Sequence, residues 1–370
     1  MPYASSSAAR RLGLKYPIIQ GPFGGGLSTV RMTASVAELG GLGSFGAHHL
    51  PPESIGTIVR EIKMSTSRPF AMNLWVSNRD AGGGPLTPEQ FDAAFEFYEP
   101  FYHELGLPKP ARPLAFDESF EDQAWALIES EPPAFSFVFG VPPAEILEGC
   151  RRRDIVTIGA ATSIAEARLL DQAGVDLIVA SGFEAGGHRP SFLRRAEDSL
   201  MGTFALTQLI ADRVRAPVIA AGGIVDGRGA RAALTLGAQA VQLGTAFLAC
   251  EESGATAQHR EILFSSRAED TTLTRAYTGR LARGIPNRVV EVMARRANDL
   301  LPFPIQSWFV SKLRAADAAA SRSNFLSLYS SQSAPNLQHR SVAELMHSLV
   351  EELDTSRTTV RTVFIPQQLE

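Results

Sequence analysis

The sequence predicts an α/β protein, a (β/α)8 TIM barrel with an insertion after the third strand and a C-terminal helical extension. Eight short apolar segments, amphipathic segments between them and glycines where several of the apolar segments end support this fold class. Both faces of the eight segments are apolar, which is typical of buried parallel strands. The predicted strands begin at Pro17, Leu42, Phe70, Phe135, Asp154, Asp176, Pro217 and Ala240.

Helices are expected between these strands. The segments Thr29–Leu39, Glu53–Met64 and Ser163–Ala173 are amphipathic at helical spacing, and Ser163 with Glu166 forms a capping-box pattern. One strand and one helix per step favour the closed barrel over a doubly wound sheet. The doubly wound alternative usually carries a G-x-G-x-x-G turn after its first strand, and residues 21–26 lack that spacing.

The predicted organisation is a barrel over residues 1–250, an insertion over 77–133 and a helical extension over 251–370. The insertion contains a glycine-rich turn and an aromatic segment, Phe91 to Tyr102, at helical spacing. We expect these rings to pack in a core, because aromatic side chains dominate burial. An exposed aromatic helix that forms a homodimer contact is the alternative. Residues 1–11 are expected to be a short frayed lead-in.

Composition narrows the class of function. The chain carries 35 Lys+Arg against 39 Asp+Glu, a formal net charge of −4, which argues against nucleic-acid binding. Apolar runs are too short to cross a membrane. Cys150 and Cys250 form neither a disulfide framework nor a zinc motif, so we expect no metal and a cytoplasmic location.

Glycines end the two predicted strands nearest the C-terminus of the barrel. Gly222 and Gly223 follow the seventh strand, and Gly244 and Thr245 follow the eighth. Bare backbone there, together with a helix N-terminus, favours a phosphate group, and barrels often bind phosphate at these two strands. Taken alone, each glycine motif is equally well explained by a tight turn between a strand and the next helix. A phosphate site also does not identify the reaction, because many barrels with different activities have one.

Together these segments resemble the FMN-dependent nitronate monooxygenases, formerly called 2-nitropropane dioxygenases. The resemblance covers most of residues 17–287, and the Glu-Ala-Gly-Gly-His string that ends at His188 is its most specific part. The other matching segments are PIIQGPF, FAMNL, FSFVFGVPP, PVIAAGGI, AVQLGTAFL and TGRLARGIPNR.

By this resemblance His188 is the catalytic base. The resemblance also implies a set of FMN contacts: Gly21, Pro22, Asn73, Ser181, Gly186, Gly222, Gly223, Gln242, Leu243, Gly244 and Thr245. A histidine with an ordinary pKa of about 6.5 is able to take a proton near neutral pH, or to hold an anion as imidazolium. Of the other histidines, His48 or His49 is a candidate for the pocket wall because both follow the second strand.

Two sites depart from the family pattern. Ser181 replaces a more usual Gln, and residues 329–333 read Tyr-Ser-Ser-Gln-Ser where an aromatic-x-Gly-Gln-Gly string is frequent. We therefore expect altered flavin affinity or substrate shape rather than a different fold.

Several charged residues near these motifs have two interpretations each. Arg280, Arg283 and Arg288 surround a glycine-rich loop that is a candidate to cover the pocket, although such arginines are usually solvated or paired. Glu184 lies close to the predicted flavin, and a structural role as a cap or ion-pair partner is the favoured interpretation.

The predicted reaction is oxidation of an alkyl nitronate, or of a nitroalkane, by FMN and O2 to a carbonyl compound and nitrite. An NAD(P)H-dependent flavin reductase of the quinone or enoyl-ACP reductase type is the first alternative. A non-catalytic flavin- or phosphate-binding barrel is the second, and it draws its support from the two departures above.

Overall fold

The computed structural model describes residues 6–76, 80 and 84–354. Gly82 and Gly83 of the predicted glycine-rich turn lie outside the described residues, as do the two ends of the chain, 1–5 and 355–370. No helix in the described part of the chain is long and apolar enough to cross a membrane.

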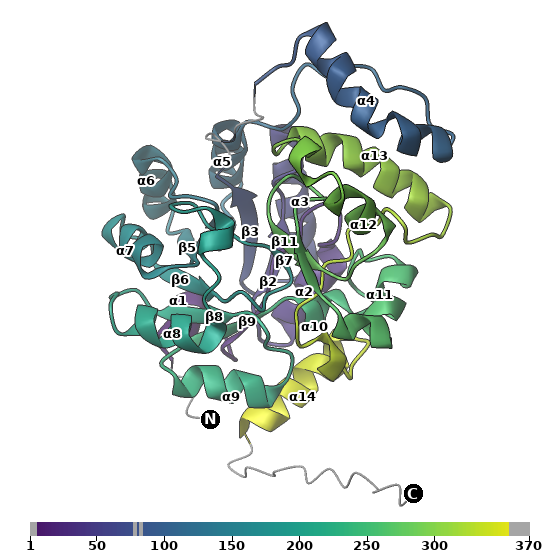
Figure 1. Cartoon of the computed structure of the whole chain (residues 1–370). Coiled ribbons are helices and arrows are strands. Elements are labelled where there is room, and N and C mark those ends of the chain that lie inside the picture. Colours follow the sequence, from purple (N-terminus) through teal and green to yellow (C-terminus); the bar gives the residue numbers. More distant parts are fainter. Residues whose placement is uncertain (1–5, 77–79, 81–83, 355–370) are drawn as a thin grey trace, which may run out of the picture.

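Eight parallel strands form the barrel, and all eight predicted strands are present (Figure 1). Their order in the sheet is β1-β9-β8-β6-β5-β4-β3-β2. Leu42 donates to the carbonyl oxygen of Ile18 and accepts from the N–H of Gln20, both at 2.9 Å, which brings β2 back to β1 and closes the barrel. The strands are β1 (Ile18–Gln20), β2 (Gly43–Gly46), β3 (Phe70–Trp75), β4 (Ala134–Val138), β5 (Val156–Ala161), β6 (Leu177–Ser181), β8 (Val218–Ala221) and β9 (Ala240–Leu243).

Both faces of these strands are buried, as the apolar runs predict. In β6, Leu177 and Val179 belong to one apolar cluster, whereas Ile178 and Ala180 belong to another. Successive side chains of a strand point to opposite faces, so one cluster fills the barrel and the other lies under the helices.

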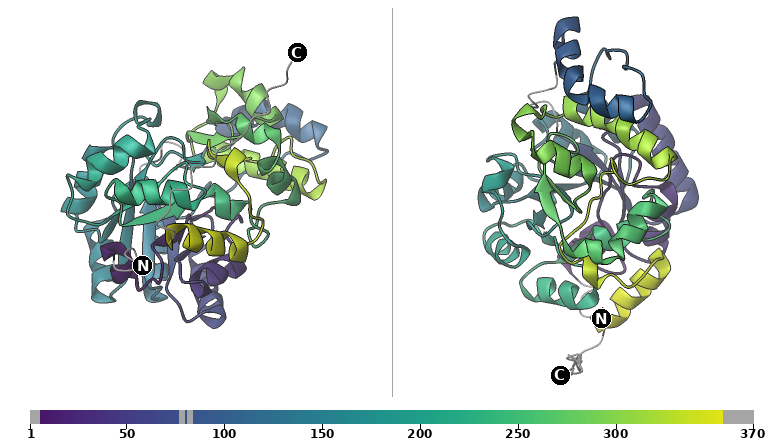
Figure 2. Two further views of the ribbon diagram at one scale, coloured as in Figure 1. Left: turned by 90° about the horizontal axis from the view of Figure 1, so that it is seen from below. Right: turned by 45° about the vertical axis from the view of Figure 1, so that its right-hand side comes forward.

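Helices surround the barrel, and the last one closes the ring. Figure 2 shows this layer from two sides. The helix at the end of the described chain, α14, packs between α9 and α2, where the partner of the eighth strand is expected. The ring consists of α2 (Val30–Glu38), α3 (Pro52–Ser65), α5 (Phe120–Glu129), α6 (Ala144–Arg152), α7 (Ile164–Gln172), α8 (Thr203–Ala211), α9 (Gly227–Thr235) and α14 (Val342–Asp354).

Local capping determines where these helices begin. Ser163 accepts from the N–H of Glu166 at 3.3 Å and starts α7, as predicted. The carboxylate of Glu166 does not complete a capping box, because it accepts from Thr162 on one side and from the N–H groups of Phe192 and Leu193 on the other. It thereby ties α7 to the segment that follows His188.

The expected frayed lead-in is wrong for its described part. Residues Ser7–Leu12 form α1, which starts at the Ser6 cap. Ala8 and Ala9 are fully buried in the cluster that fills the barrel, so α1 covers one end of the barrel interior. The segment is helical because its small apolar residues have a buried surface to contact.

A second layer lies over the carboxyl ends of the strands. It contains a three-stranded antiparallel sheet, of β10 (Thr272–Thr274), β11 (Ala282–Gly284) and β7 (Gly187–His188). It also contains α10 (Thr245–Leu248), α11 (Ala257–Leu263), α12 (Arg288–Ala294), α13 (Ile305–Ala319) and the helix of the insertion, α4 (Pro88–Glu104).

The aromatic side chains of α4 are buried rather than exposed. They pack mainly against α13, where Phe309 stacks on Tyr98 with ring centres 4.5 Å apart (Figure 1). Packing is the interpretation that the structure confirms, and the alternative of an exposed aromatic dimer surface is wrong. The other helix within 77–133, α5, belongs to the ring and packs against α3 and α6.

Replacing Phe309 with Ala should lower the free energy of unfolding by about 3–5 kcal/mol, because Phe309 is fully buried and its removal leaves a cavity between α4 and α13. Chemical denaturation measures this change. Leu114→Ala, at a side chain that is 93% exposed, is the control and should change stability by less than about 0.5 kcal/mol. Equal effects of the two substitutions would contradict this account of the α4–α13 contact.

Candidate active site

A cavity of about 800 Å³ lies at the carboxyl ends of the strands, under the second layer. All but one of the residues predicted for the site line it. They are Gly21, Pro22, Asn73, Ser181, Gly186, His188, Gly222, Gly223, Gln242, Gly244 and Thr245. The structure thus brings together, from five strands and the small sheet, residues that are far apart in the sequence.

Leu243 is the exception. Its side chain is fully buried in the cluster outside the barrel, because alternation along β9 turns it away from the cavity that Gln242 lines. Its carbonyl oxygen accepts from the N–H of Gly21 at 2.8 Å and holds the first strand end in place. The predicted flavin contact of Leu243 is therefore not made by its side chain.

The glycines after β8 and β9 leave bare backbone in the wall of the cavity. Gly222 and Gly223 have φ angles of 118° and 68°, which L side chains rarely adopt. At Gly244, a Cβ atom would meet only the Cε1 atom of Phe23, at 3.9 Å, so the space beside this residue is open. A phosphate group with its ribityl chain fits such a cradle, because backbone N–H groups are able to approach it closely.

The unusual C-terminal string lies against this cradle. The N–H of Ser331 donates to Oγ1 of Thr245 at 2.9 Å, and that of Gln332 donates to the carbonyl oxygen of Glu184 at 3.1 Å. A Cβ on Gly186 would lie 2.6 Å from the carbonyl carbon of Ser330, so this glycine is required for the contact. The residues that replace the usual family string therefore contact the cradle in which we expect the cofactor to bind.

Glu184 has the structural role that the sequence favours. Its carboxylate accepts from both the N–H and the hydroxyl of Thr203, at 2.9 and 2.8 Å, and caps α8 in place of the side chain that Gly202 lacks.

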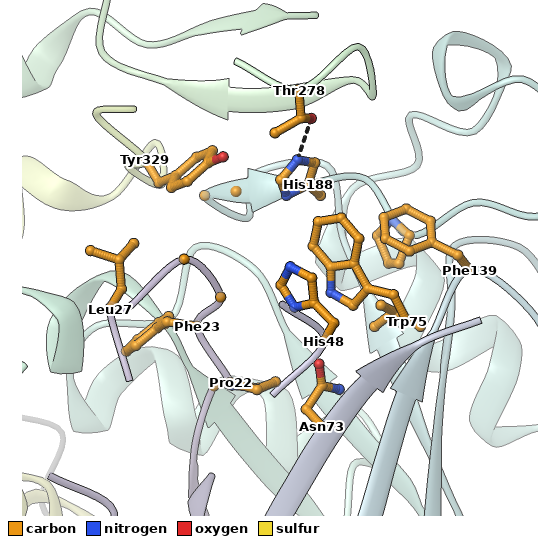
Figure 3. Close-up of a pocket in the computed structure, with 18 of the residues that line it drawn as sticks. Pro22, Phe23, Leu27, His48, Asn73, Trp75, Phe139, His188, Thr278 and Tyr329 are labelled. Atoms are coloured by element: carbon orange, nitrogen blue, oxygen red, sulfur yellow. Dashed lines mark hydrogen bonds between the residues drawn. The ribbon is translucent and has the colours of Figure 1, made fainter. Parts of the chain in front are cut away.

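His188 lies in the cavity wall, and a second sheet holds it there. Figure 3 shows its ring under Thr278 and beside Trp75. Nε2 of His188 and Oγ1 of Thr278 share a hydrogen bond of 2.8 Å, and β7 pairs with β11, placing His188 opposite Ala282. The sequence places this histidine on a loop, whereas the structure places it in a two-residue strand, too short for a pattern to reveal.

Burial, followed by the positive charge of Arg280, lowers the pKa of His188 to about 3. The expectation of an ordinary pKa is therefore wrong. The imidazole is neutral at neutral pH and carries no positive charge for an anion. Because Nε2 bonds to Thr278, Nδ1 is the nitrogen left free, as a base in one tautomer and as a hydrogen-bond donor in the other.

The wall also contains Trp75, which the sequence did not single out, and both histidines that follow the second strand, which it did. Trp75, at the end of β3, lies between two imidazoles: its ring centre is 3.8 Å from that of His48, in a stacked arrangement, and 4.8 Å from that of His188, edge-on. His49 lines the cavity too, so both histidines after β2 do so. The only sequence feature that predicted the two histidines in the wall was their position after a strand. No sequence feature predicted Trp75 there.

The three arginines after the barrel do not line the cavity. Arg280 forms a part-buried ion pair with Asp80 and lies over the ring of Phe139, with 3.6 Å between the guanidinium carbon and the ring centre. Arg283 donates to backbone and hydroxyl oxygens, and Arg288 pairs with Glu104. Among the described residues, Arg314 of α13 lines the wall, and no motif indicated it.

Buried histidines make stability depend on pH. Burial lowers the pKa of His188 to about 3 and that of His259 to about 4. The unfolded chain takes up these protons near pH 6.5 and the folded chain does not, so the free energy of unfolding should fall as pH drops below about 6.5 and level off above it. An NMR titration of the flavin-free protein should show both imidazoles neutral down to about pH 5. A midpoint near 6.5 for His188 would contradict the burial of its ring.

A (β/α)8 barrel with a glycine-lined cradle at the strand ends and a part-buried imidazole in the same cavity fits a flavin-dependent oxidoreductase. The family model for nitronate monooxygenase matches residues 6–352. The chain therefore belongs to the nitronate monooxygenase family, whose members oxidise nitronates with a flavin.

Individual relatives support this assignment. The chain is 35% identical to the probable nitronate monooxygenase of Staphylococcus haemolyticus, over 96% of this chain and 99% of that protein. Its structure is similar to that of nitroalkane oxidase from Streptomyces ansochromogenes, with a TM-score of 0.82, 31% identity and coverage of 94% and 98%. It is also similar to FabK from Thermotoga maritima, with a TM-score of 0.72, 25% identity and coverage of 94% and 96%.

Proposed function

We propose that this protein uses FMN and O2 to convert an alkyl nitronate into a carbonyl compound and nitrite. The observation that supports this most is the position of His188, a neutral imidazole in the wall of the same cavity that the cradle of Gly222, Gly223 and Gly244 lines. A phosphate-bearing flavin in the cradle and a small substrate beside the histidine account for both features.

The cradle after β8 and β9 would hold the phosphate of FMN. Asn73 lines the cavity further along and donates from Nδ2 to Oγ of Ser136 at 3.0 Å, which orients its amide for a contact with the ring. When bound, FMN accepts the electrons of the nitronate and passes them to O2. The protein contributes the orientation of the substrate and a pocket that excludes water.

His188 has one of two tasks, and the form of the substrate decides which. With a neutral nitroalkane, the unprotonated ring nitrogen removes the proton from the carbon that bears the nitro group. With a preformed nitronate that proton is already gone, and a ring N–H donates to a nitronate oxygen. Thr278, through its hydrogen bond to Nε2, holds the ring in place for either task.

Purified protein loaded with FMN, mixed with ethyl nitronate in air, tests this function. Acetaldehyde and nitrite should appear in equal amounts while O2 is consumed. A flavin-loaded protein that releases no nitrite would contradict the proposal. A preparation that neither carries nor takes up flavin would favour the non-catalytic alternative.

We infer a cytoplasmic location from the cysteine content, since both Cys150 and Cys250 are free thiols. A homodimer stays a prediction, and size-exclusion chromatography with light scattering tests it.

A further inference from the structure

The wall of the cavity contains a second imidazole, that of His48, held as firmly as that of His188. Gln123, which is almost fully buried, donates from Nε2 to the carbonyl oxygens of His48 and Leu50, both at 2.8 Å. The backbone of Gly24 passes so close that a Cβ there would lie 1.9 Å from Cε1 of His48. The third constraint is the stacked indole ring of Trp75.

The two ring nitrogens of His48 differ. Nδ1 is buried and has no hydrogen-bond partner among the described residues, whereas Nε2 is not among the buried unpartnered atoms. Because a buried N–H without an acceptor is costly, the proton belongs on Nε2 rather than on Nδ1. Since His48 lines the cavity, this Nε2–H is the donor that a ligand in the cavity reaches.

The charge state of His48 limits the kind of partner. Burial is the main cause that lowers its pKa well below the ordinary value, and His49, His188, Arg280 and Arg314 lower it further. A neutral imidazole offers one N–H donor. The substrate class of this family carries its negative charge on the two oxygens of a planar NO2 group, which are strong acceptors.

The positions of the two imidazoles also favour the NO2 group of the substrate as the partner of His48. His48 and His188 pack on one indole ring, that of Trp75, at 3.8 and 4.8 Å between ring centres. Figure 3 shows His48 between the strand ends that carry Pro22 and Asn73 and the small sheet that carries His188. The two imidazoles therefore border one compartment of the cavity.

We propose that His48 is a second substrate-binding residue, which donates a hydrogen bond to an oxygen of the substrate's NO2 group while His188 acts from the other side of Trp75. This inference rests on the proposed function. It makes the binding of the NO2 group depend on a residue that is outside the motifs of the family resemblance.

The test compares His48→Phe, which keeps a flat ring on Trp75 and removes both nitrogens, with His48→Gln, which keeps a donor. His347→Phe is the matched control, at an exposed imidazole on α14 that lies outside the cavity wall. The KM for ethyl nitronate should rise about tenfold or more in His48→Phe, because a hydrogen bond to an anion is lost, with kcat changing less. His48→Gln should recover most of the loss, and His347→Phe should stay within about twofold of wild type.

Sodium nitrite, which carries the NO2 group but is not oxidised as a nitronate, gives a readout separate from activity. Titrated into the FMN-loaded protein and followed by the flavin absorption, it should bind about tenfold more weakly to His48→Phe than to wild type. Unchanged KM and unchanged nitrite affinity in His48→Phe would overturn the role of His48. A wild-type protein that binds nitrite but does not convert ethyl nitronate would instead overturn the proposed function.

Discussion

Replacing His188 with Asn should lower kcat/KM for neutral nitroethane by about 10²- to 10⁴-fold, the usual contribution of a general base. Asn keeps a polar side chain near Thr278 but has no basic nitrogen to take the proton from carbon. The same variant should lose much less activity on preformed ethyl nitronate, because that substrate needs only a hydrogen-bond donor.

Parallel assays of nitrite release from the two substrates measure this difference. His347→Asn is the control, since His347 is exposed on α14 and is not part of the cavity wall. The proton-abstraction role is contradicted if His188→Asn loses activity equally on nitroethane and on ethyl nitronate.

Replacing Gly244 with Val should yield a folded protein that no longer retains FMN. The Cβ position of Gly244 has one neighbour within 4 Å, an atom of Phe23 that also lines the cavity, so the added methyl groups enter the cradle. The backbone there, with φ −97° and ψ −78°, requires no glycine. We expect the Kd for FMN to rise about 100-fold or more, since the displaced phosphate loses several hydrogen bonds with charged character.

Fluorescence quenching of free FMN by the apoprotein measures this Kd, and thermal unfolding of the apoprotein verifies the fold. Gly84→Val is the control, because a Cβ at Gly84 meets nothing within 4 Å and this glycine lies outside the cavity wall. FMN affinity that survives in Gly244→Val would place the phosphate elsewhere.

The barrel could be predicted because buried parallel strands leave a strong sequence signal. Every residue of β5, for example, is buried, so the whole of Val156–Ala161 is apolar or small. The glycines after β8 and β9 were informative for a similar reason. A ligand is able to approach the backbone closely only where there is no side chain, so few residues other than glycine occur there.

The second layer could not be predicted in the same way. β7 consists of Gly187 and His188 alone, and its partner β11 contains the buried Arg283, so neither shows an apolar pattern. The ion pair of Arg280 with Asp80 joins residues that are far apart in the chain, and only the folded structure reveals it. These contacts depend on the barrel being formed first.

The chemistry of the site shows the same limit. The sequence identified His188 as the candidate base, but its lowered pKa follows from burial under Thr278 and beside Trp75, which no spacing encodes. His48 reaches the wall from a loop, and its position after a strand was a weak signal in the sequence. Arg314 reaches the wall from α13, and nothing in the sequence indicated it.

Anaerobic mixing of the FMN-loaded protein with ethyl nitronate, and separately with NADH, decides whether a nitronate or a nicotinamide reduces the flavin. We expect rapid loss of the oxidised flavin absorption with ethyl nitronate, and recovery with nitrite release when O2 is admitted. Rapid loss with NADH but not with ethyl nitronate would contradict it and identify a nicotinamide-dependent reductase.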